Sequence, residues 1–207
     1  MSVPSKDRDW AAYYVKTGGR PPRETLLFAL DRFDGEPADA KRFAVDLGAG
    51  GGRDAIEMLR RGWRVLAIDA EPDAIAALNA RPDLPPGADF SGEVARFEDA
   101  TWPPCDLVNS SFALPLCAPP DFTRVWRRIG SSLRPGGRFA GQLYGDRDSW
   151  AGRDGMTFHT LADVEALLAG WDVEHFVEEE DDSTTPRGEV KHWHVFHLVA
   201  RMTSSEA

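Results

Sequence analysis

The stretch from residue 45 to residue 54, VDLGAGGGRD, constrains the fold of this chain more than any other. The apolar residues 43–45 enter it and the helix-like segment 55–61 leaves it, so the pattern predicts a strand, a glycine turn and a helix. Glycine lets the backbone approach a ligand closely, and the helix N-terminus adds the positive end of a dipole. A second apolar run, residues 65–68, ends in Asp69, whose carboxylate can accept the hydroxyls of a ribose. We therefore expect this unit to bind a nucleoside.

The spacing of the glycines indicates which nucleoside. The dinucleotide fingerprint G-x-G-x-x-G, started at Gly48, puts Arg53 at its third glycine. Started at Gly50, it puts Ala55 there, which the relaxed form allows, but the turn then begins late. The pattern that fits without adjustment is an acid followed by G-x-G-x-G, made by Asp46, Gly48, Gly50 and Gly52. This pattern resembles the first motif of class I S-adenosylmethionine (SAM) dependent methyltransferases.

Length and composition limit the remaining classes. At 207 residues with 42% apolar side chains, the chain suits one domain over 1–207, with 1–35 as an N-terminal lid and helix. A net charge of −10 argues against nucleic acid held through phosphate contacts. Cys105 and Cys117 form no C-x-x-C pair, which favours a reducing compartment. Because no apolar run reaches roughly 18 residues and the N-terminus is polar, we expect a cytoplasmic protein, monomer or homodimer, that contacts no membrane.

Periodicity and turn residues divide the chain into alternating strands and helices followed by an antiparallel pair. This order predicts an α/β fold with a doubly wound, mostly parallel, seven-stranded Rossmann-like sheet and an antiparallel C-terminal hairpin. In the first half of the chain we expect a helix over 22–33, the strand–turn–helix unit over 42–61, a strand over 64–68, a helix over 72–81 and a strand within 89–97. The second half should contain a strand from 106, a helix over 120–133, a strand ending at 143 and a helix opened by a capping box of Thr160 and Asp163. Two last strands, over 171–177 and 190–199, are expected to be joined by an acidic loop, 178–189.

Further motifs extend the resemblance to class I methyltransferases over most of the chain. Residues 97–99 stand where that family places an acidic residue against the adenine amino group, and residues 106–108 and 133–137 are similar to its fourth- and fifth-strand signatures. The resemblance implies SAM as the cofactor and a small molecule as the methyl acceptor. The cofactor-binding residues that it implies are Asp46, Gly48, Ala49, Gly50, Gly52, Asp69, Ala70, Glu98, Asp99 and Ser110, with Tyr14 and Arg23 from the N-terminal segment.

The ends of the chain are similar to a narrower group, the tellurite-resistance type of small methyltransferase, whose members need not act on tellurite. The similar pieces are residues 13–14, 22–26, 156–160 and 191–196. A nucleotide-binding regulatory module or a nicotinamide-dependent enzyme built on the same sheet is the alternative, because a fold alone does not fix a function.

Methyl transfer from a sulfonium is an in-line displacement that needs alignment and exclusion of water. Positioning can supply several kcal/mol, so we assign no catalytic residue and expect Ser110, His159 or His192 changed to Ala to lower turnover by about 10²-fold at most. Strand alternation puts His192 and His194 on one face and His197 on the other, so too few ligands converge for a metal site. The residues expected to line the substrate are Ser111, Phe112, Tyr144, His159, His192 and Trp193.

Overall fold

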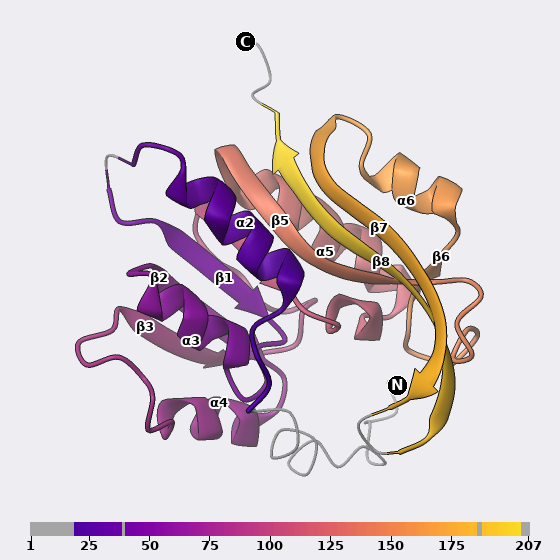
Figure 1. Cartoon of the computed structure of the whole chain (residues 1–207), viewed down its shortest axis with the longest axis horizontal. Helices are drawn as coiled ribbons and strands as arrows, with labels where there is room; N and C mark the ends of the chain where they lie inside the picture. The colour runs from indigo at the N-terminus through magenta and orange to yellow at the C-terminus, as the bar shows by residue number, and fades with distance from the viewer. Residues whose placement is uncertain (1–18, 39, 186–187, 204–207) are drawn as a thin grey trace.

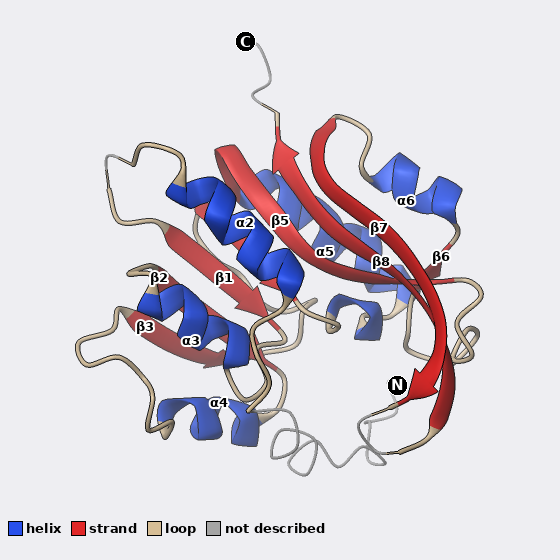
Figure 2. Ribbon diagram, viewed as in Figure 1, coloured by secondary structure: helices blue, strands red, loops and turns tan. Residues whose placement is uncertain are grey.

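The computed structural model describes residues 19–38, 40–185 and 188–203. Its sheet has the strand order β3-β2-β1-β4-β5-β8-β7, with β6 paired to β5 (Figure 2). All pairs among β1 to β6 are parallel, and β8 is antiparallel to both of its neighbours. The predicted fold class is confirmed, and the two-residue β6 is an addition. The strands are β1 (Phe43–Leu47), β2 (Arg64–Asp69), β3 (Phe90–Val94), β4 (Cys105–Ser110), β5 (Leu133–Gly145), β6 (Phe158–His159), β7 (Trp171–Thr184) and β8 (Val190–Met202).

Helices cover both faces of the sheet. Figure 1 shows α2 and α3 in front of it and α5 behind it. Leu30, Ile56 and Leu78 belong to the core on the α2 side, whereas Val125 and Val164 belong to the core on the α5 side. Each helix therefore buries one apolar stripe against the strands. The helices are α2 (Glu24–Asp34), α3 (Arg53–Arg60), α4 (Pro72–Asn79), α5 (Pro119–Ser132) and α6 (Leu161–Leu167), with a short 3₁₀ turn η1 (Leu114–Leu116).

The C-terminal hairpin is longer than the sequence predicted. The expected acidic loop over 178–189 is wrong, because β7 continues through this region to Thr184 and pairs with β8. Glu180 faces His194 across the ladder and Asp182 faces His192, so basic partners offset the acidic side chains. Opposite charges across a ladder are favourable, which allows a charged strand to form.

Two polar contacts anchor the helices that frame the sheet. Thr160 and Asp163 form the predicted capping box at the start of α6. Arg138 of β5 is buried and donates to Glu36, just after α2, and to Glu174 of β7, each at 2.6 Å. The guanidinium thereby holds the end of α2 over β5 and β7. Among the described residues, no helix is long and apolar enough to cross a membrane.

Candidate active site

The glycine turn between β1 and α3 has the backbone that its sequence predicts. Gly48, Gly50 and Gly52 have φ values of 75°, 52° and 78°, in the left-handed region that favours glycine. A Cβ on Gly48 would lie 2.2 Å from the Cβ of Ala113, and one on Gly52 would lie 2.0 Å from a methyl of Leu78. Glycine is therefore required at both ends of the turn by conformation and by space.

The N–H groups of this turn are largely used within the protein. Those of Gly48 and Ala49 donate to the Ile68 carbonyl, at 2.8 Å and 3.1 Å. The N–H of Gly50 donates to Oδ2 of Asp69 at 2.8 Å. A dinucleotide site instead presents such N–H groups to a pyrophosphate. The turn is thus better suited to a ligand without phosphate.

Carboxylates gather around the same turn. Asp46 at the end of β1 and Asp54 in the first turn of α3 are both buried, and Nδ2 of Asn109 donates to them at 2.8 Å and 3.4 Å. Burial, reinforced by the charge of Asp54, raises the pKa of Asp46 to about 7. Oδ2 of Asp46 and Oδ1 of Asn109 are buried and have no hydrogen-bond partner among the described residues. Two unpaired acceptors in an acidic setting favour a cationic ligand group.

Asp69, the expected ribose ligand, ends β2 beside the glycine turn. Its Oδ2 accepts the N–H of Gly50, and its Oδ1 accepts the N–H of Glu71 at 2.9 Å. Burial raises the pKa of this carboxyl. Each carboxylate oxygen can accept a second hydrogen bond, so Asp69 can still receive a hydroxyl, and its present partners fix its orientation. Ala70, the next residue, is exposed.

The segment after β3 reaches the glycine turn. Cζ of Phe97 would be 3.4 Å from a Cβ on Gly48, so the ring borders the turn. Oε1 of Glu98 is held by Nε of Arg96 at 2.5 Å, and Asp99 is exposed. The ring of Phe97 therefore contacts the turn, and the contact described for Glu98 is with Arg96.

At the tip of β4, Ser110 and Ser111 have different environments. The Ser110 hydroxyl donates to the Leu47 carbonyl and accepts the Leu114 N–H, both at 3.1 Å. The buried Ser111 hydroxyl has no partner among the described residues. Ser110, predicted to bind the cofactor, joins β1 to η1 through these two bonds, whereas the Ser111 hydroxyl is buried with its hydrogen-bonding capacity unused by the described residues.

Phe112 follows these serines with an unusual backbone. Its φ is 56°, and it is the one non-glycine residue in the described part of the chain with a positive φ. Its N–H donates to Oε1 of Gln142 at 3.1 Å, and Nε2 of Gln142 donates to the Thr25 hydroxyl at 2.9 Å. The guanidinium of Arg23 lies 4.2 Å from the centre of the Phe112 ring. Helix α2 and β5 together hold this residue in place.

An aromatic cluster, defined here as Phe112, Tyr144, Trp150, Phe158 and Trp193, surrounds that position. The Phe112 ring is 6.2 Å from both Tyr144 and Trp193, and 6.0 Å from His197. Phe112 and Trp193 are only half-buried, so the cluster keeps an accessible face. Flat apolar surfaces of this kind bind flat apolar ligands.

A buried ion pair supports the rim of this cluster. The Lys191 ammonium binds Oδ2 of Asp148 and lies 3.6 Å from the centre of the Trp193 ring and 4.4 Å from that of Trp150. The other Asp148 oxygen accepts the N–H of Trp150 at 2.9 Å. The pair therefore fixes two of the aromatic walls.

Two predicted substrate-lining residues lie elsewhere. His192 is on the opposite face of β8 from Trp193, where its ring binds Asp182 and Glu180. His159 faces α5, with its ring 4.7 Å from that of Phe122, and it lines a separate depression between α5 and α6. Strand alternation explains the first case, and the turn into α6 the second. Tyr14 lies outside the described residues.

The site residues predicted from the sequence did not include Asn109, Gln142 and Lys191, and His197 was considered only as a metal ligand. Gln142 is a single polar residue within an apolar run, whereas Asn109, Lys191 and His197 have other polar residues near them in the sequence. Neither pattern says which side chain each residue meets. A polar residue in a strand that is expected to be buried is the signal that could have found them, because a buried polar group needs a hydrogen-bond partner.

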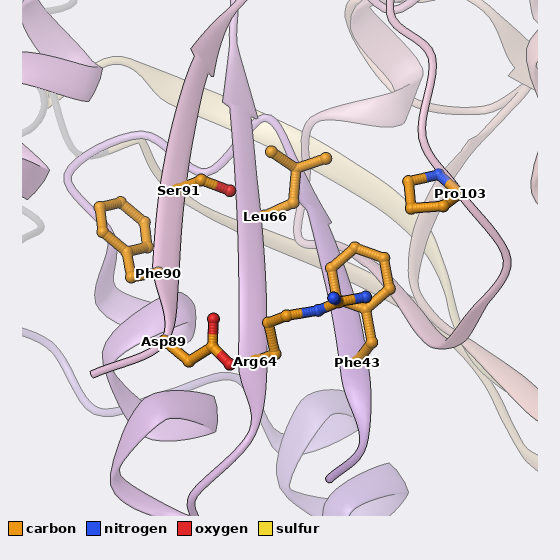
Figure 3. Close-up of a pocket in the computed structure, with 7 residues that line it drawn as sticks. All are labelled: Phe43, Arg64, Leu66, Asp89, Phe90, Ser91 and Pro103. Atoms are coloured by element: carbon orange, nitrogen blue, oxygen red, sulfur yellow. The ribbon is translucent and has the colours of Figure 1, made fainter. Parts of the chain in front are cut away.

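One further hollow, of about 240 Å³, lies at the amino-terminal ends of strands β1 to β3. Figure 3 shows Phe43 and Arg64 at the beginnings of β1 and β2 and Asp89 just before β3. The glycine turn follows the opposite end of β1. The Arg64 guanidinium covers the Phe43 ring at 4.0 Å. Ligands of open α/β sheets bind at the carboxyl ends of the strands, so this hollow is separate from the candidate site. Among the described residues, no group of three or more His, Cys, Asp or Glu is placed to hold a metal ion.

Comparison with known proteins agrees with this geometry. Residues 44–137 match the family described as a methyltransferase domain. No curated protein matches the chain. The structure is similar to that of TehB from Haemophilus influenzae, with a TM-score of 0.74 at 15% identity. The superposition covers 92% of this chain and 66% of TehB. The present chain thus spans slightly less than two thirds of TehB.

Two other solved structures contain the cofactor or its product. One is the 1,6-didemethyltoxoflavin-N1-methyltransferase of Burkholderia thailandensis with its substrate and S-adenosylhomocysteine (TM-score 0.63, 21% identity, 99% of this chain and 92% of that one). The other is the magnesium protoporphyrin IX methyltransferase of Synechocystis PCC 6803 with SAM (TM-score 0.66, 12% identity, 95% and 92%). At these identities the similarity shows the fold.

Proposed function

We propose that this chain, whose residues 44–137 match a methyltransferase domain, transfers the methyl group of SAM to a small molecule bound against the aromatic cluster. The alternatives, a nicotinamide-dependent enzyme or a nucleotide-binding regulatory module, are disfavoured because the N–H groups of the glycine turn bond within the protein instead of facing a pyrophosphate.

One residue carries this proposal, because it touches both halves of the site. The N–H of Arg23 donates to Oδ1 of Asp54 beside the glycine turn at 3.1 Å, while its guanidinium covers the Phe112 ring at 4.2 Å. A methyl donor bound at the glycine turn and a methyl acceptor bound at the aromatic cluster would therefore be neighbours. In-line displacement needs this adjacency.

The cofactor half has groups for each part of SAM. Gly48, Gly50 and Gly52 allow close approach of the backbone, and Asp69 is oriented to accept ribose hydroxyls. The unpaired oxygens of Asp46 and Asn109 suit the ammonium of the methionine part. Asp54 adds negative charge there, which favours the cationic cofactor over one that carries a pyrophosphate. Ala49, Ala70, Glu98, Asp99 and Arg23 stay within the proposed cofactor site.

The acceptor half supplies alignment and excludes water. SAM provides an activated methyl group when bound, so the chain must hold a nucleophile in line with it and keep water away. Ser111, Phe112, Tyr144 and Trp193 line this half of the site. Their apolar surfaces favour an uncharged or aromatic acceptor over a strongly hydrated ion.

The same proposal includes finer assignments. We propose a single domain over 1–207 that acts in the cytoplasm as a monomer or homodimer and binds no nucleic acid, in keeping with its charge of −10. Similarity in fold to TehB supports the narrower tellurite-resistance type, in which a chalcogen compound is one possible acceptor. A chalcogen anion and a flat organic molecule are different substrates, and the panel of acceptors in the next experiment distinguishes between them.

Calorimetry and product formation test the function. SAM and S-adenosylhomocysteine should bind with micromolar affinity and NAD should give no heat. S-adenosylhomocysteine should then form when SAM is mixed with a panel of phenols, thiols, amines and tellurite. Phe112→Ala should abolish product formation and leave SAM affinity within about threefold, because the ring lies beyond the cofactor half. An inactive panel with intact SAM binding contradicts the small-molecule proposal, and tight NAD binding contradicts the cofactor assignment.

A further inference from the structure

His197 of β8 is the histidine that faces the aromatic cluster. Its ring packs edge-on against Phe112, with centres 6.0 Å apart. Its Nε2 lies 2.8 Å from Oε2 of Glu179 on β7, and one fifth of its side chain is exposed. It pairs in the ladder with Gln142, the residue that holds the Phe112 N–H. His197 thus lies beside the acceptor half of the site and is open to a ligand.

The contact with Glu179 determines which imidazole nitrogen is free. A carboxylate can only accept, so Nε2 carries the hydrogen and donates it. In the neutral ring, Nδ1 then has the lone pair. An imidazole oriented by a carboxylate in this way is the arrangement used by histidine bases.

The surroundings keep this ring neutral. Burial lowers the pKa of His197, with Arg23 and His175 acting in the same direction and Glu179 opposing them. Arg23 is the N-cap of α2, and the other two groups lie on β7. A neutral imidazole at physiological pH can accept a proton.

The other four histidines of the chain do not face the cluster. His192 and His194 lie on the opposite face of β8 and bind carboxylates there. His159 faces α5, and His175 packs against Phe28 at 5.0 Å. Only His197 combines an accessible nitrogen with contact to Phe112.

We propose that His197 is the general base of the reaction and that the acceptor is a planar aromatic molecule with an O–H or N–H to lose. This inference rests on the proposed function and names the substrate class of that site. The flat ring packs on Phe112, Tyr144 and Trp193, which places its O–H or N–H toward Nδ1 of His197. This proposal and the sequence-based expectation of a site without an essential base give different outcomes when His197 is changed.

The step balances without another reactant. Nδ1 of His197 takes the proton from the acceptor, and the electron pair left on oxygen or nitrogen forms the new bond to the methyl carbon. The carbon–sulfur bond breaks, and its electron pair stays on sulfur to give S-adenosylhomocysteine. Glu179 stabilises the imidazolium, which later loses its proton to water.

The first experiment uses 4-nitrophenol, whose absorption shifts to longer wavelength when it ionises. The protein is loaded with S-adenosylhomocysteine, and the spectrum of the bound phenol is recorded across pH. For the wild-type protein the bound phenol should ionise at least one pH unit below free 4-nitrophenol. His197→Asn should abolish this shift, and Glu179→Gln should reduce it. His192→Asn is the matched control, since that histidine is on the same strand, binds carboxylates in the same way and faces the other side.

The second experiment compares two acceptors with SAM present. His197→Asn should lower kcat for phenol by about 10²-fold or more with little change in KM, because the phenol needs a base. The same variant should retain its rate with thiophenolate, which is already ionised at the pH of the assay. Circular dichroism of the His197→Asn and Glu179→Gln proteins checks that they are folded.

Each result decides the inference. Bound phenol that ionises equally in wild-type and His197→Asn proteins overturns the role of His197. Failure of 4-nitrophenol to bind a protein that retains S-adenosylhomocysteine overturns the aromatic hydroxyl class. Loss of S-adenosylhomocysteine binding itself, measured by calorimetry on the same samples, counts against the proposed function instead.

Discussion

Oε1 of Gln142 accepts the N–H of Phe112 at 3.1 Å, and this contact holds Phe112 at a φ of 56°. A positive φ is costly for a residue with a bulky side chain, so the surrounding structure must maintain it. Gln142 is buried and also donates to Thr25 of α2. The position of the Phe112 ring in the acceptor half therefore depends on β5 and α2.

Changing Gln142 to Met should lower both stability and turnover. It leaves the N–H of Phe112 and the hydroxyl of Thr25 without partners, at a cost of about 1–3 kcal/mol each. Urea unfolding and S-adenosylhomocysteine formation measure the two effects. Thr25→Val is the control, since it breaks only the contact to α2. Equal loss of turnover in both variants would show that the bond to Phe112 has no special role.

Changing Asp69 to Ala should weaken SAM binding by about 2–4 kcal/mol, because two hydrogen bonds from ribose hydroxyls to a charged acceptor are lost. The melting temperature without ligand should also fall, since Asp69 holds the N–H groups of Gly50 and Glu71. Calorimetry and thermal unfolding separate these effects. Asp73→Asn, an exposed change in α4, is the charge control. Unchanged SAM affinity in Asp69→Ala contradicts the ribose assignment.

SAM affinity should rise with pH through about 7, with Asp46 as the cause. Burial raises the pKa of Asp46 to about 7, and only its ionised form attracts the cofactor's ammonium. Below that value the affinity should fall by about tenfold per pH unit. Stability without ligand has the opposite sign: the folded state binds the proton more tightly, so Asp46 destabilises progressively as pH rises from about 4 to 7.

Calorimetry in buffers of different ionisation enthalpy measures this dependence, because binding at pH 6 should release a proton. Asp46→Asn should bind SAM more weakly and with a flatter pH profile. A wild-type affinity that is constant from pH 6 to pH 8 rules out Asp46 as the ammonium ligand.

Changing Lys191 to Met should destabilise the protein by about 3–5 kcal/mol, because it leaves the buried Asp148 carboxylate unpaired. The exposed pair of Arg134 and Asp106 provides the comparison. Its removal by Arg134→Met should cost about 0–1 kcal/mol. Urea unfolding measures both values. Similar costs for the two variants would mean that water reaches the Lys191 pair.

The sequence alone determined the features that depend on local conformation. The spacing of Gly48, Gly50 and Gly52 predicted a turn, and each of these residues has a positive φ. The capping box of Thr160 and Asp163 is present as predicted. Short-range sterics and hydrogen bonds control both features, so neighbouring residues are enough to predict them.

Tertiary structure decided which polar groups meet. Alternation along β8 separated His192 from His197 into two faces, but only packing against Phe112 shows which face belongs to the site. In the same way, packing gives the Ser110 hydroxyl bonds to Leu47 and Leu114, whereas the buried Ser111 hydroxyl has no partner among the described residues. Such contacts join residues far apart in the chain, and their partners follow from the way strands and helices pack rather than from any local pattern.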